Sequence, residues 1–508
     1  MTGFYLLPEF YYIFFLSGLV LFCIVYSTSL KLHYPLLIKS ALLNSLYLFG
    51  LIFFMYMNTF SYNEFVSYMT LQVTSYTTLL KLVIVVLSFF LLLLTLSYIK
   101  YEKINSFEYV ILVLLSILGL LFLLSTNNII ILFLSLELQS LSFYILCSYQ
   151  RTKEASIEAG LKYFIFGSFA SALLLFGVAL LYGLTGITYF SDFAVVYSKI
   201  PNFDLLDIMS LRLGIDTFFS GFTTDNAIAL LGLTLLIVGF LFKLYAVPFH
   251  VWVPDIYEGS PTSVTALFAL LPATAIFGFF VKVLYVSFLP FIDHWSLILL
   301  ITSTLSLILG AFAAIAQKRI KRLIAYSSIG HTGYLLLGLS SGSIEALNAT
   351  FFYVISYSIM TLAFFSAYMS LRKQVTGVLV EYIADFRALL KQNPIIAAAL
   401  AVAFFSMAGI PPLLGFFSKL YIFLSVAEQY RYFFLFLCIT TSAVGAYYYL
   451  NVVRVMFFET KSQWVLFRKV PGELAFLLAI SIFAIVLFVV HPSFFIALSY
   501  KLTFLLLL

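Results

Sequence analysis

The sequence predicts an all-α polytopic membrane protein with about 14 transmembrane helices. Of its 508 residues, 63% are hydrophobic and only 9% are charged, and the mean hydropathy is +1.11. Soluble domains carry about 25% charged residues, so this composition excludes an ordinary soluble enzyme. Apolar runs of about 20 residues, enough to cross a bilayer core as a helix, recur along the whole chain. Because these runs are continuously apolar and do not alternate, they favour helices over barrel strands.

These runs define the expected spans and loops. We expect spans at roughly residues 9–28, 35–57, 78–98, 108–125, 128–148, 159–184, 226–247, 266–289, 296–316, 323–341, 347–370, 395–425, 432–453 and 473–490. The first run is not expected to be a cleaved signal, because Glu9 precedes it and no basic segment comes before it.

Basic residues alternate between the loops on the two sides of the expected bilayer. Loops on one side hold eighteen of them: Lys31, Lys39, Lys100, Lys103, Arg151, Lys153, Lys318, Arg319, Lys321, Arg322, Arg372, Lys373, Arg387, Lys391, Arg454, Lys461, Arg468 and Lys469. The other loops and the C-terminal tail hold only four: Lys199, Arg212, Arg431 and Lys501. This asymmetry fits the positive-inside rule, with both termini and the acidic loop 185–225 outside. The net charge of +6 therefore reflects membrane topology and does not indicate nucleic-acid binding.

One motif occurs twice within the predicted membrane region. The sequence GFLFKLY at 239–245 reappears as GFFSKLY at 415–421, an offset of 176 residues, and prolines lie near both copies. Proline breaks helices, and a lysine beside a broken helix, present twice, is typical of transporters built from repeats. Since the offset spans five helices, we expect inverted repeats of five helices, although frequent Phe and Leu also make a chance match possible. The expected segments are an N-terminal three-helix segment 1–107, a first repeat 108–289, a second repeat 290–457, and a C-terminal helix and tail 458–508.

The first repeat carries an acid and a base at membrane depth. Glu137 lies near the middle of its run, where a charge costs at least about 2.5–3.5 kcal/mol. Lys243 is the best candidate partner. A proton-exchanging pair explains both residues, and a purely structural ion pair is the alternative.

The remaining polar residues at depth are weaker candidates. Lys419 has no obvious acidic neighbour and is predicted to carry protons, while His250 and His331 are either proton relays or residues that satisfy local hydrogen bonds. Lys162 lies four residues after Glu158, so a helical ion pair explains it as well as a proton role does. Lys81 begins its run and is expected to reach the membrane interface.

No motif for a cofactor or metal is present. The chain has neither the glycine-rich fingerprints of nucleotide sites nor the histidine and cysteine spacings of haem and iron–sulfur sites. We expect no cofactor and no metal on this chain, so its driving force must come from an ion gradient or a partner.

Five stretches together resemble a known family. They are ELQSLSFYIL from Glu137, EAGLKYFIFGSFAS from Glu158, FLFKLYAVPFHVWVPDIYEGSPTSVTA from Phe240, IKRLIAYSSIGHTGYLLLG from Ile320 and AGIPPLLGFFSKLYIF from Ala408. The chain resembles the antiporter-like membrane subunits of respiratory complex I (NADH:ubiquinone oxidoreductase), subunit 2 more than its sisters 4 and 5.

The resemblance implies a function, partners and a location. It implies proton half-channels coupled to quinone reduction elsewhere in the complex, with FMN, iron–sulfur clusters and ubiquinone in partner subunits. Other membrane subunits, including sister antiporter-like subunits, and the lipid bilayer would be its neighbours. The location would be the mitochondrial inner membrane, or alternatively a bacterial plasma membrane. Glu137, Lys243, His250, His331 and Lys419 match the family's proton-pathway positions.

One position departs from the family pattern. The eighth helix of the family carries a lysine where this chain has Ala273, and the nearest cation, Lys282, is nine residues further on. Water and Thr274 could bridge the half-channels, Lys282 could bend back, or the subunit could conduct poorly. Two alternatives therefore stay open: an Mrp-type cation/proton antiporter subunit and a conduction-silent scaffold. An antiporter would need several oxygen ligands at depth, whereas a scaffold would leave Glu137, Lys243 and Lys419 unexplained.

Overall fold

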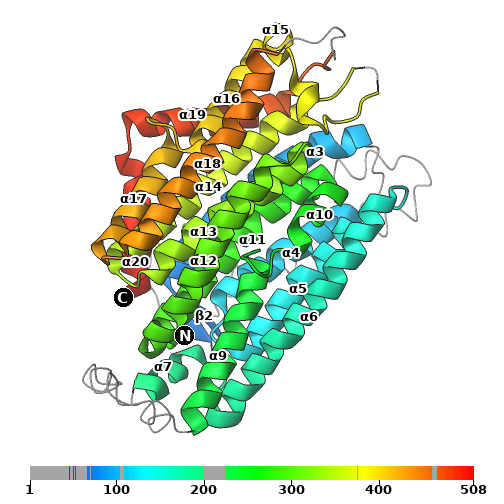
Figure 1. The fold of residues 1–508 in the computed structure, drawn as a ribbon. Helices are drawn as coiled ribbons and strands as arrows, with labels where there is room; N and C mark the ends of the chain where they lie inside the picture. Colours follow the sequence, from blue (N-terminus) through cyan, green and yellow to red (C-terminus); the bar gives the residue numbers. More distant parts are fainter. Residues whose placement is uncertain are drawn as a thin grey trace, which may run out of the picture.

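The computed structural model is a bundle of long, roughly parallel helices (Figure 1). It describes residues 66–102, 108–198, 224–459 and 466–507, apart from positions 69 and 375, together with the isolated positions 45, 50 and 52. Nine helices in these ranges are long and apolar enough to cross a membrane. The chain is thus a multispanning helical membrane protein, as its composition predicts.

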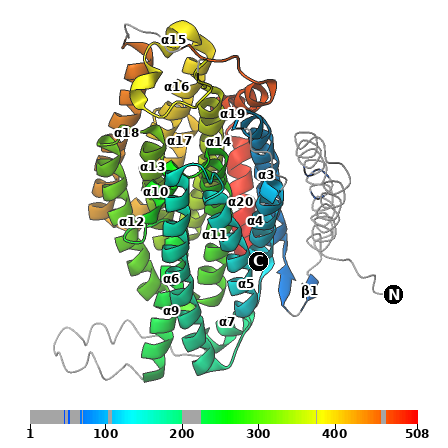
Figure 2. The same ribbon diagram turned by 90° about the vertical axis from the view of Figure 1, so that its right-hand side faces the viewer.

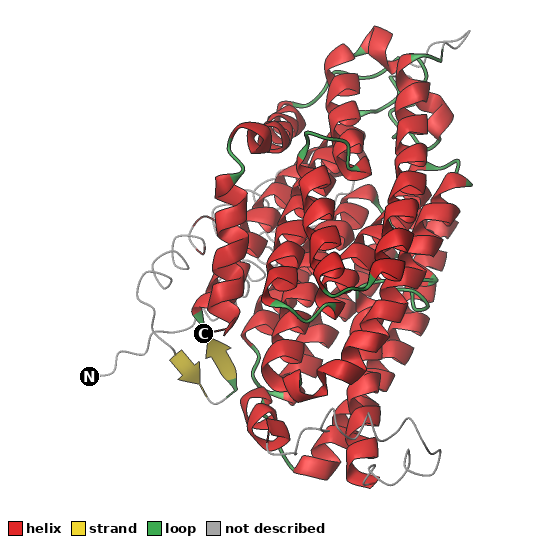
Figure 3. Ribbon diagram, turned by 60° about the vertical axis from the view of Figure 1, so that its left-hand side comes forward, coloured by secondary structure: helices red, strands yellow, loops and turns green. Residues whose placement is uncertain are grey.

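The helices follow one another along the chain with short connections. They are α3 (Ser75–Glu102), α4 (Glu108–Ser125), α5 (Ile129–Cys147), α6 (Glu154–Thr185), α7 (Phe190–Ser198), α9 (Thr224–Lys243), α10 (Trp252–Gly259), α11 (Thr262–Lys282), α12 (Ile292–Ile315), α13 (Ile320–Ser340), α14 (Ile344–Ser370), α15 (Leu389–Gln392), α16 (Pro394–Ala408), α17 (Leu414–Glu428), α18 (Tyr432–Phe457), α19 (Gly472–Val490) and α20 (Ser493–Leu507). A π-helical turn, Val283–Ser287, extends α11. The two short strands β1 (Val66–Tyr68) and β2 (Leu71–Val73) form an antiparallel hairpin (Figure 3).

Helices occupy the twelve apolar runs expected between residues 78 and 490. The two runs expected at 9–28 and 35–57 lie outside the described residues, except for positions 45, 50 and 52. Five elements were not expected: the β hairpin, α7 within the loop 185–225, the short helices α10 and α15, and α20. The last corrects the prediction of a C-terminal tail, because Lys501 lies in a helix that packs on α14 and α3.

Lys81 also differs from expectation. The helix α3 begins at Ser75, before the apolar run, so Lys81 lies well inside it and its exposed fraction is 0%. The helix α11 packs against α3 at this level, and the Tyr76 hydroxyl donates to the Gly278 carbonyl at 2.8 Å. Lys81 is therefore a buried cation and does not reach the interface.

The two halves of the bundle meet along their central helices. The helix α10 packs on α13, and α11 packs on α14, α3 and α4. Every residue of α11 is buried, so this helix forms the centre of the molecule. The helix α15 lies in a loop that is rich in basic residues, and α7 lies in the acidic loop 185–225. The two helices are at opposite ends of the bundle (Figure 2), as the charge asymmetry predicts.

Candidate functional site

The first break in a membrane helix lies directly after Lys243. The helix α9 ends there in a Schellman motif: the Ala246 amide donates to the Leu241 carbonyl, and the Tyr245 amide donates to the Phe242 carbonyl. Tyr245 adopts a left-handed conformation (φ 52°), which glycine usually occupies at such a position. The peptide Val247–Pro248 is cis. The chain therefore turns sharply at membrane depth before α10 begins.

Lys243 and Glu137 form the ionisable pair of this half. The Lys243 side chain is only 6% exposed, and its Nζ has no hydrogen-bond partner among the described residues. It lies at the negative, C-terminal end of α9 and within electrostatic range of Glu137 on α5. Ser140 donates to Oε2 of Glu137 at 3.3 Å, whereas Oε1 is buried and has no hydrogen-bond partner in the described ranges. The predicted pair is thus close but not joined in a salt bridge, and each group keeps free hydrogen-bonding capacity.

The second break separates α16 from α17. The helix α16 also ends in a Schellman motif, in which the Ile410 amide donates to the Phe405 carbonyl and Gly409 adopts a left-handed conformation (φ 85°). Lys419, on α17, reaches back across the break, and its Nζ donates to the carbonyls of Met407 at 2.9 Å and Ala408 at 2.8 Å. Its ammonium group therefore caps the negative end of α16.

The two breaks correct the alignment of the repeated motif. The GFLFKLY copy precedes its break, whereas the GFFSKLY copy follows its own, so the shared letters do not mark equivalent positions. The hydrogen-bond pattern instead matches Tyr245 with Gly409, an offset of 164 residues. Both lysines nevertheless lie at the C-terminal end of the helix that precedes a break. Lys243 is in the last turn of α9, and Lys419 reaches back from α17 to the end of α16.

His331 lies next to Lys419 in a buried cluster of tyrosines. Its Nδ1 is 2.7 Å from the Tyr353 hydroxyl and its Nε2 is 3.1 Å from the Tyr449 hydroxyl, so both ring nitrogens are engaged. Lys419 Nζ lies 5.3 Å from the centre of the Tyr334 ring. His331 and Lys419 also line one cavity of about 20 Å³, room for a single water molecule. The structure thus joins two predicted site residues through polar groups on four helices.

Several of these groups were not predicted from the sequence. Tyr353 and Tyr357 lie four residues apart on one face of α14, and Tyr449 comes from α18. Tyrosine is frequent throughout this chain, with 35 occurrences, so composition does not distinguish these three. The four-residue spacing on α14 was the available signal.

His250 lies in the turn of the first break, whereas Lys282 lies away from both lysine sites. His250 is half-buried in the turn between α9 and α10, and its carbonyl accepts from the Val253 amide at 2.9 Å. Lys282 is buried at the end of α11, where its Nζ lies 3.4 Å from the Thr126 carbonyl and near Lys81. Lys282 does not bend back toward Ala273. Within the described ranges, no three His, Cys, Asp or Glu side chains gather as metal ligands would.

Lys162 belongs to an ion-pair network at the rim of the bundle. Its Nζ lies 2.7 Å from Glu158 and 2.8 Å from Asp255, and Asp255 also pairs with Arg322 at 2.6 Å. Glu258, on α10, pairs with Arg319 and Arg322. This network ties α6 and α10 to α13. It favours the ion-pair interpretation of Lys162 over a role in proton transfer.

We therefore expect Lys162→Ala to change the proton translocation that the resemblance implies by less than about twofold. Because the pairs are 34–65% exposed, they stabilise the fold by about 1 kcal/mol or less. The measurement is the pumping rate of the assembled protein together with its thermal unfolding midpoint. A loss of pumping with normal assembly would restore the proton-transfer interpretation.

The chain is similar to known proteins over nearly its whole length. A family model described as the NADH:quinone oxidoreductase/Mrp antiporter transmembrane family matches residues 126–445. NADH-ubiquinone oxidoreductase chain 2 of Marchantia polymorpha is 37% identical over 489 residues, 96% of this chain and 95% of that protein. NADH-quinone oxidoreductase subunit N of Pelagibacter ubique is 42% identical over 374 residues, covering 74% of each protein.

A solved structure agrees with these relatives. A chain of respiratory complex I from Thermus thermophilus, with bound aureothin, is similar at a TM-score of 0.75 and 27% identity, covering 97% of this chain and 99% of that one. The resemblance inferred from the five sequence stretches is thereby confirmed. The chain belongs to the transmembrane family that NADH:quinone oxidoreductases share with Mrp antiporters.

Proposed function

We propose that this chain is the chain 2 (subunit N) type of membrane subunit in an NADH:quinone oxidoreductase, where it translocates protons. Quinone reduction elsewhere in the complex would drive protons through two half-channels. Glu137 and Lys243 would exchange protons in the first half, and His331 and Lys419 in the second. His250 would assist at the first break. The two repeats, 108–289 and 290–457, would each hold one half-channel.

One observation carries this proposal: each half holds a buried lysine ammonium at the end of a broken membrane helix. Keeping a lysine permanently charged at this depth costs free energy. Binding and releasing a proton is a function that explains why such a lysine is present. Lys419 caps two carbonyls, and no carboxylate of the described part of the chain pairs with it. Its neutral amine can still donate to these carbonyls, so the proton can leave while the cap persists.

The two alternatives explain less of the site. An Mrp-type antiporter shares the family, but a Na⁺ site needs several oxygen ligands at depth, and Glu137 is the one carboxylate near the middle of the described spans. The two relatives compared above are both named as oxidoreductase subunits. A conduction-silent scaffold would explain Ala273 but would leave the buried lysines without a purpose.

The proposal also states which subunits hold the cofactors, what the lipid-facing helices contact and which membrane contains the chain. FMN, iron–sulfur clusters and ubiquinone would bind to partner subunits and none to this one. Large apolar side chains exposed along α6, among them Phe164, Ile165 and Phe169, would face lipid or the other membrane subunits, including sister antiporter-like subunits. The mitochondrial inner membrane suits the Marchantia relative, and a bacterial plasma membrane suits the Pelagibacter relative.

Native electrophoresis after mild-detergent extraction tests the assignment. We expect the chain to migrate with a large assembly that contains flavin and iron–sulfur clusters and stains for NADH dehydrogenase activity. Migration alone, or with a few small membrane proteins that exchange Na⁺ for protons, would support the antiporter. Migration with the active assembly, combined with full pumping after removal of the buried charges, would support the scaffold.

A further inference from the structure

The two lysine sites lie in different halves, and the helix between them offers no ionisable group at their level. Ala273 occupies the centre of α11, and the neighbouring Thr274 hydroxyl already donates to the carbonyls of Leu270 and Leu271 in its own helix. Lys282, the only titratable residue of α11, points to the Thr126 carbonyl at the far end of the helix. A proton that passes between the halves therefore needs another route.

A cluster of buried tyrosines lies beside α11, where the Tyr257 ring stacks on Phe268 of that helix. Tyr245 comes from the first break, Tyr257 from α10 and Tyr357 from α14, and each is at most 2% exposed. The Tyr245 hydroxyl lies within interaction range of the hydroxyls of both Tyr257 and Tyr357. Yet neither the Tyr245 nor the Tyr257 oxygen completes a well-oriented hydrogen bond with another described residue, so both keep capacity to donate and accept.

The cluster continues into the second half. The centre of the Tyr357 ring is 5.0 Å from that of His331, and its hydroxyl is within electrostatic range of Tyr353 and Tyr449. These last two tyrosines are the hydrogen-bond partners of His331. Hydroxyl and imidazole groups thus form a line that begins at Tyr245, two residues after Lys243, and ends at the cavity that Lys419 lines.

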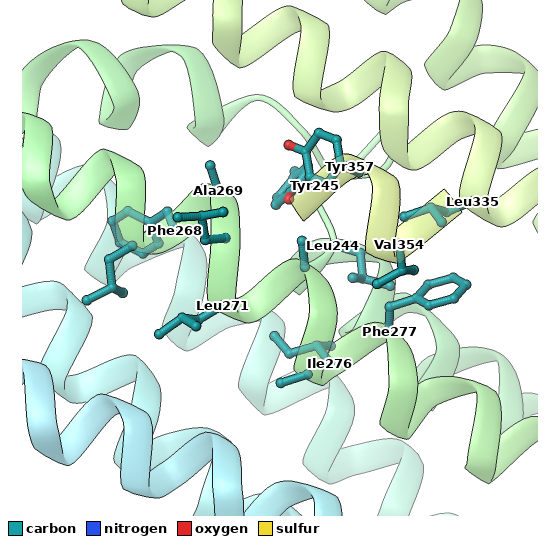
Figure 4. Close-up of a cluster of buried hydrophobic side chains, with 14 of the residues drawn as sticks. Leu244, Tyr245, Phe268, Ala269, Leu271, Ile276, Phe277, Leu335, Val354 and Tyr357 are labelled. Carbon is teal, nitrogen blue, oxygen red and sulfur yellow. The ribbon is translucent and has the colours of Figure 1, made fainter. Parts of the chain in front are cut away.

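Apolar side chains surround this line of polar groups. Figure 4 shows Tyr245 and Tyr357 side by side with Leu244 below them, and Val354, Leu335 and Phe277 grouped to one side. The Leu244 and Leu335 side chains are 1% exposed, and Phe277 is also 1% exposed. The tyrosine hydroxyls are polar groups within this apolar lining through which a proton can move between the halves.

We propose that Tyr245, Tyr257 and Tyr357 form a hydroxyl relay that carries protons between the Lys243 site and the His331–Lys419 site. In each step a tyrosine oxygen accepts a proton from one neighbour while its own O–H proton passes to the next. The hydroxyl then rotates back, so no tyrosine keeps a net charge. The relay rests on the proposed function, because it supplies the connection between the two half-channels.

The test is Tyr357→Phe in the assembled complex reconstituted into vesicles. We expect the rates of proton pumping and coupled quinone reduction to fall by about tenfold or more. Tyr245→Phe should have the same effect, and the double variant should be no worse than the slower single variant, since both hydroxyls act in one path. The matched control is Tyr368→Phe, on the same helix, which removes an equally buried hydroxyl that donates to the Val380 carbonyl at 2.6 Å.

The outcomes separate the relay from the function it serves. The relay is wrong if the Tyr357→Phe and Tyr245→Phe variants pump protons at the rate of the Tyr368→Phe control while the Lys419→Ala variant is inactive. The proposed half-channels would then still be supported. If all four variants pump normally, the proposed function fails with the relay. A slower residual rate with a larger solvent deuterium isotope effect than the control shows would support proton transfer, because a purely structural defect leaves that ratio unchanged.

Discussion

Lys419→Ala is expected to reduce proton pumping and coupled quinone reduction together, by about 10²-fold or more in assembled complex. The change removes the ammonium group beside His331. It also leaves the buried Met407 and Ala408 carbonyls without their donor. The measurement is NADH oxidation by quinone alongside proton uptake in sealed vesicles.

A second substitution separates proton exchange from helix capping. Lys419→Arg keeps a positive charge and several donors for the two carbonyls, but the guanidinium does not release its proton in proteins. We therefore expect Lys419→Arg to assemble normally and to be as inactive as Lys419→Ala. Lys321→Arg is the control, because Lys321 also donates to a backbone carbonyl, that of Ser260, at 2.8 Å. Unchanged pumping stoichiometry in assembled Lys419→Ala complex would contradict the proton role.

Glu137→Gln is expected to have the second largest effect, again about 10²-fold or more on pumping. Glutamine has nearly the shape of glutamate, so Ser140 keeps an acceptor while the negative charge near Lys243 is lost. Without that anion, Lys243 loses the carboxylate that favours its protonated form and keeps only the negative end of α9. Proton uptake at several pH values in vesicles measures this loss.

The control for Glu137 is an exposed carboxylate of the same kind. Glu158→Gln removes a charge from α6 that is 65% exposed, and Lys162 keeps its second partner, Asp255. We expect this variant to pump at nearly the normal rate. Normal pumping by both Glu137→Gln and Lys243→Met would show that the first pair only holds helices together.

Much of the architecture could be predicted from the sequence. Hydropathy is a local property, so runs of apolar residues predict where helices lie whatever packs against them. The loop cations predict the two sides of the bundle, and prolines 248 and 411 mark the two breaks. The depth of Glu137 and Lys243 follows from counting residues within their runs.

The remaining features required the tertiary structure, because the partner of a polar side chain comes from a distant segment. His331 meets Tyr449 across 118 residues, and Lys162 meets Asp255 across 93. Lys81 is buried because α11 packs over it, which hydropathy along α3 does not reveal. The sequence by itself determined the membrane fold, the separation of basic from acidic loops, and the placement of Glu137 and Lys243 within apolar runs. Only the tertiary structure decided that Lys419 caps α16 and that tyrosines from three segments converge beside α11, since packing alone brings those segments together.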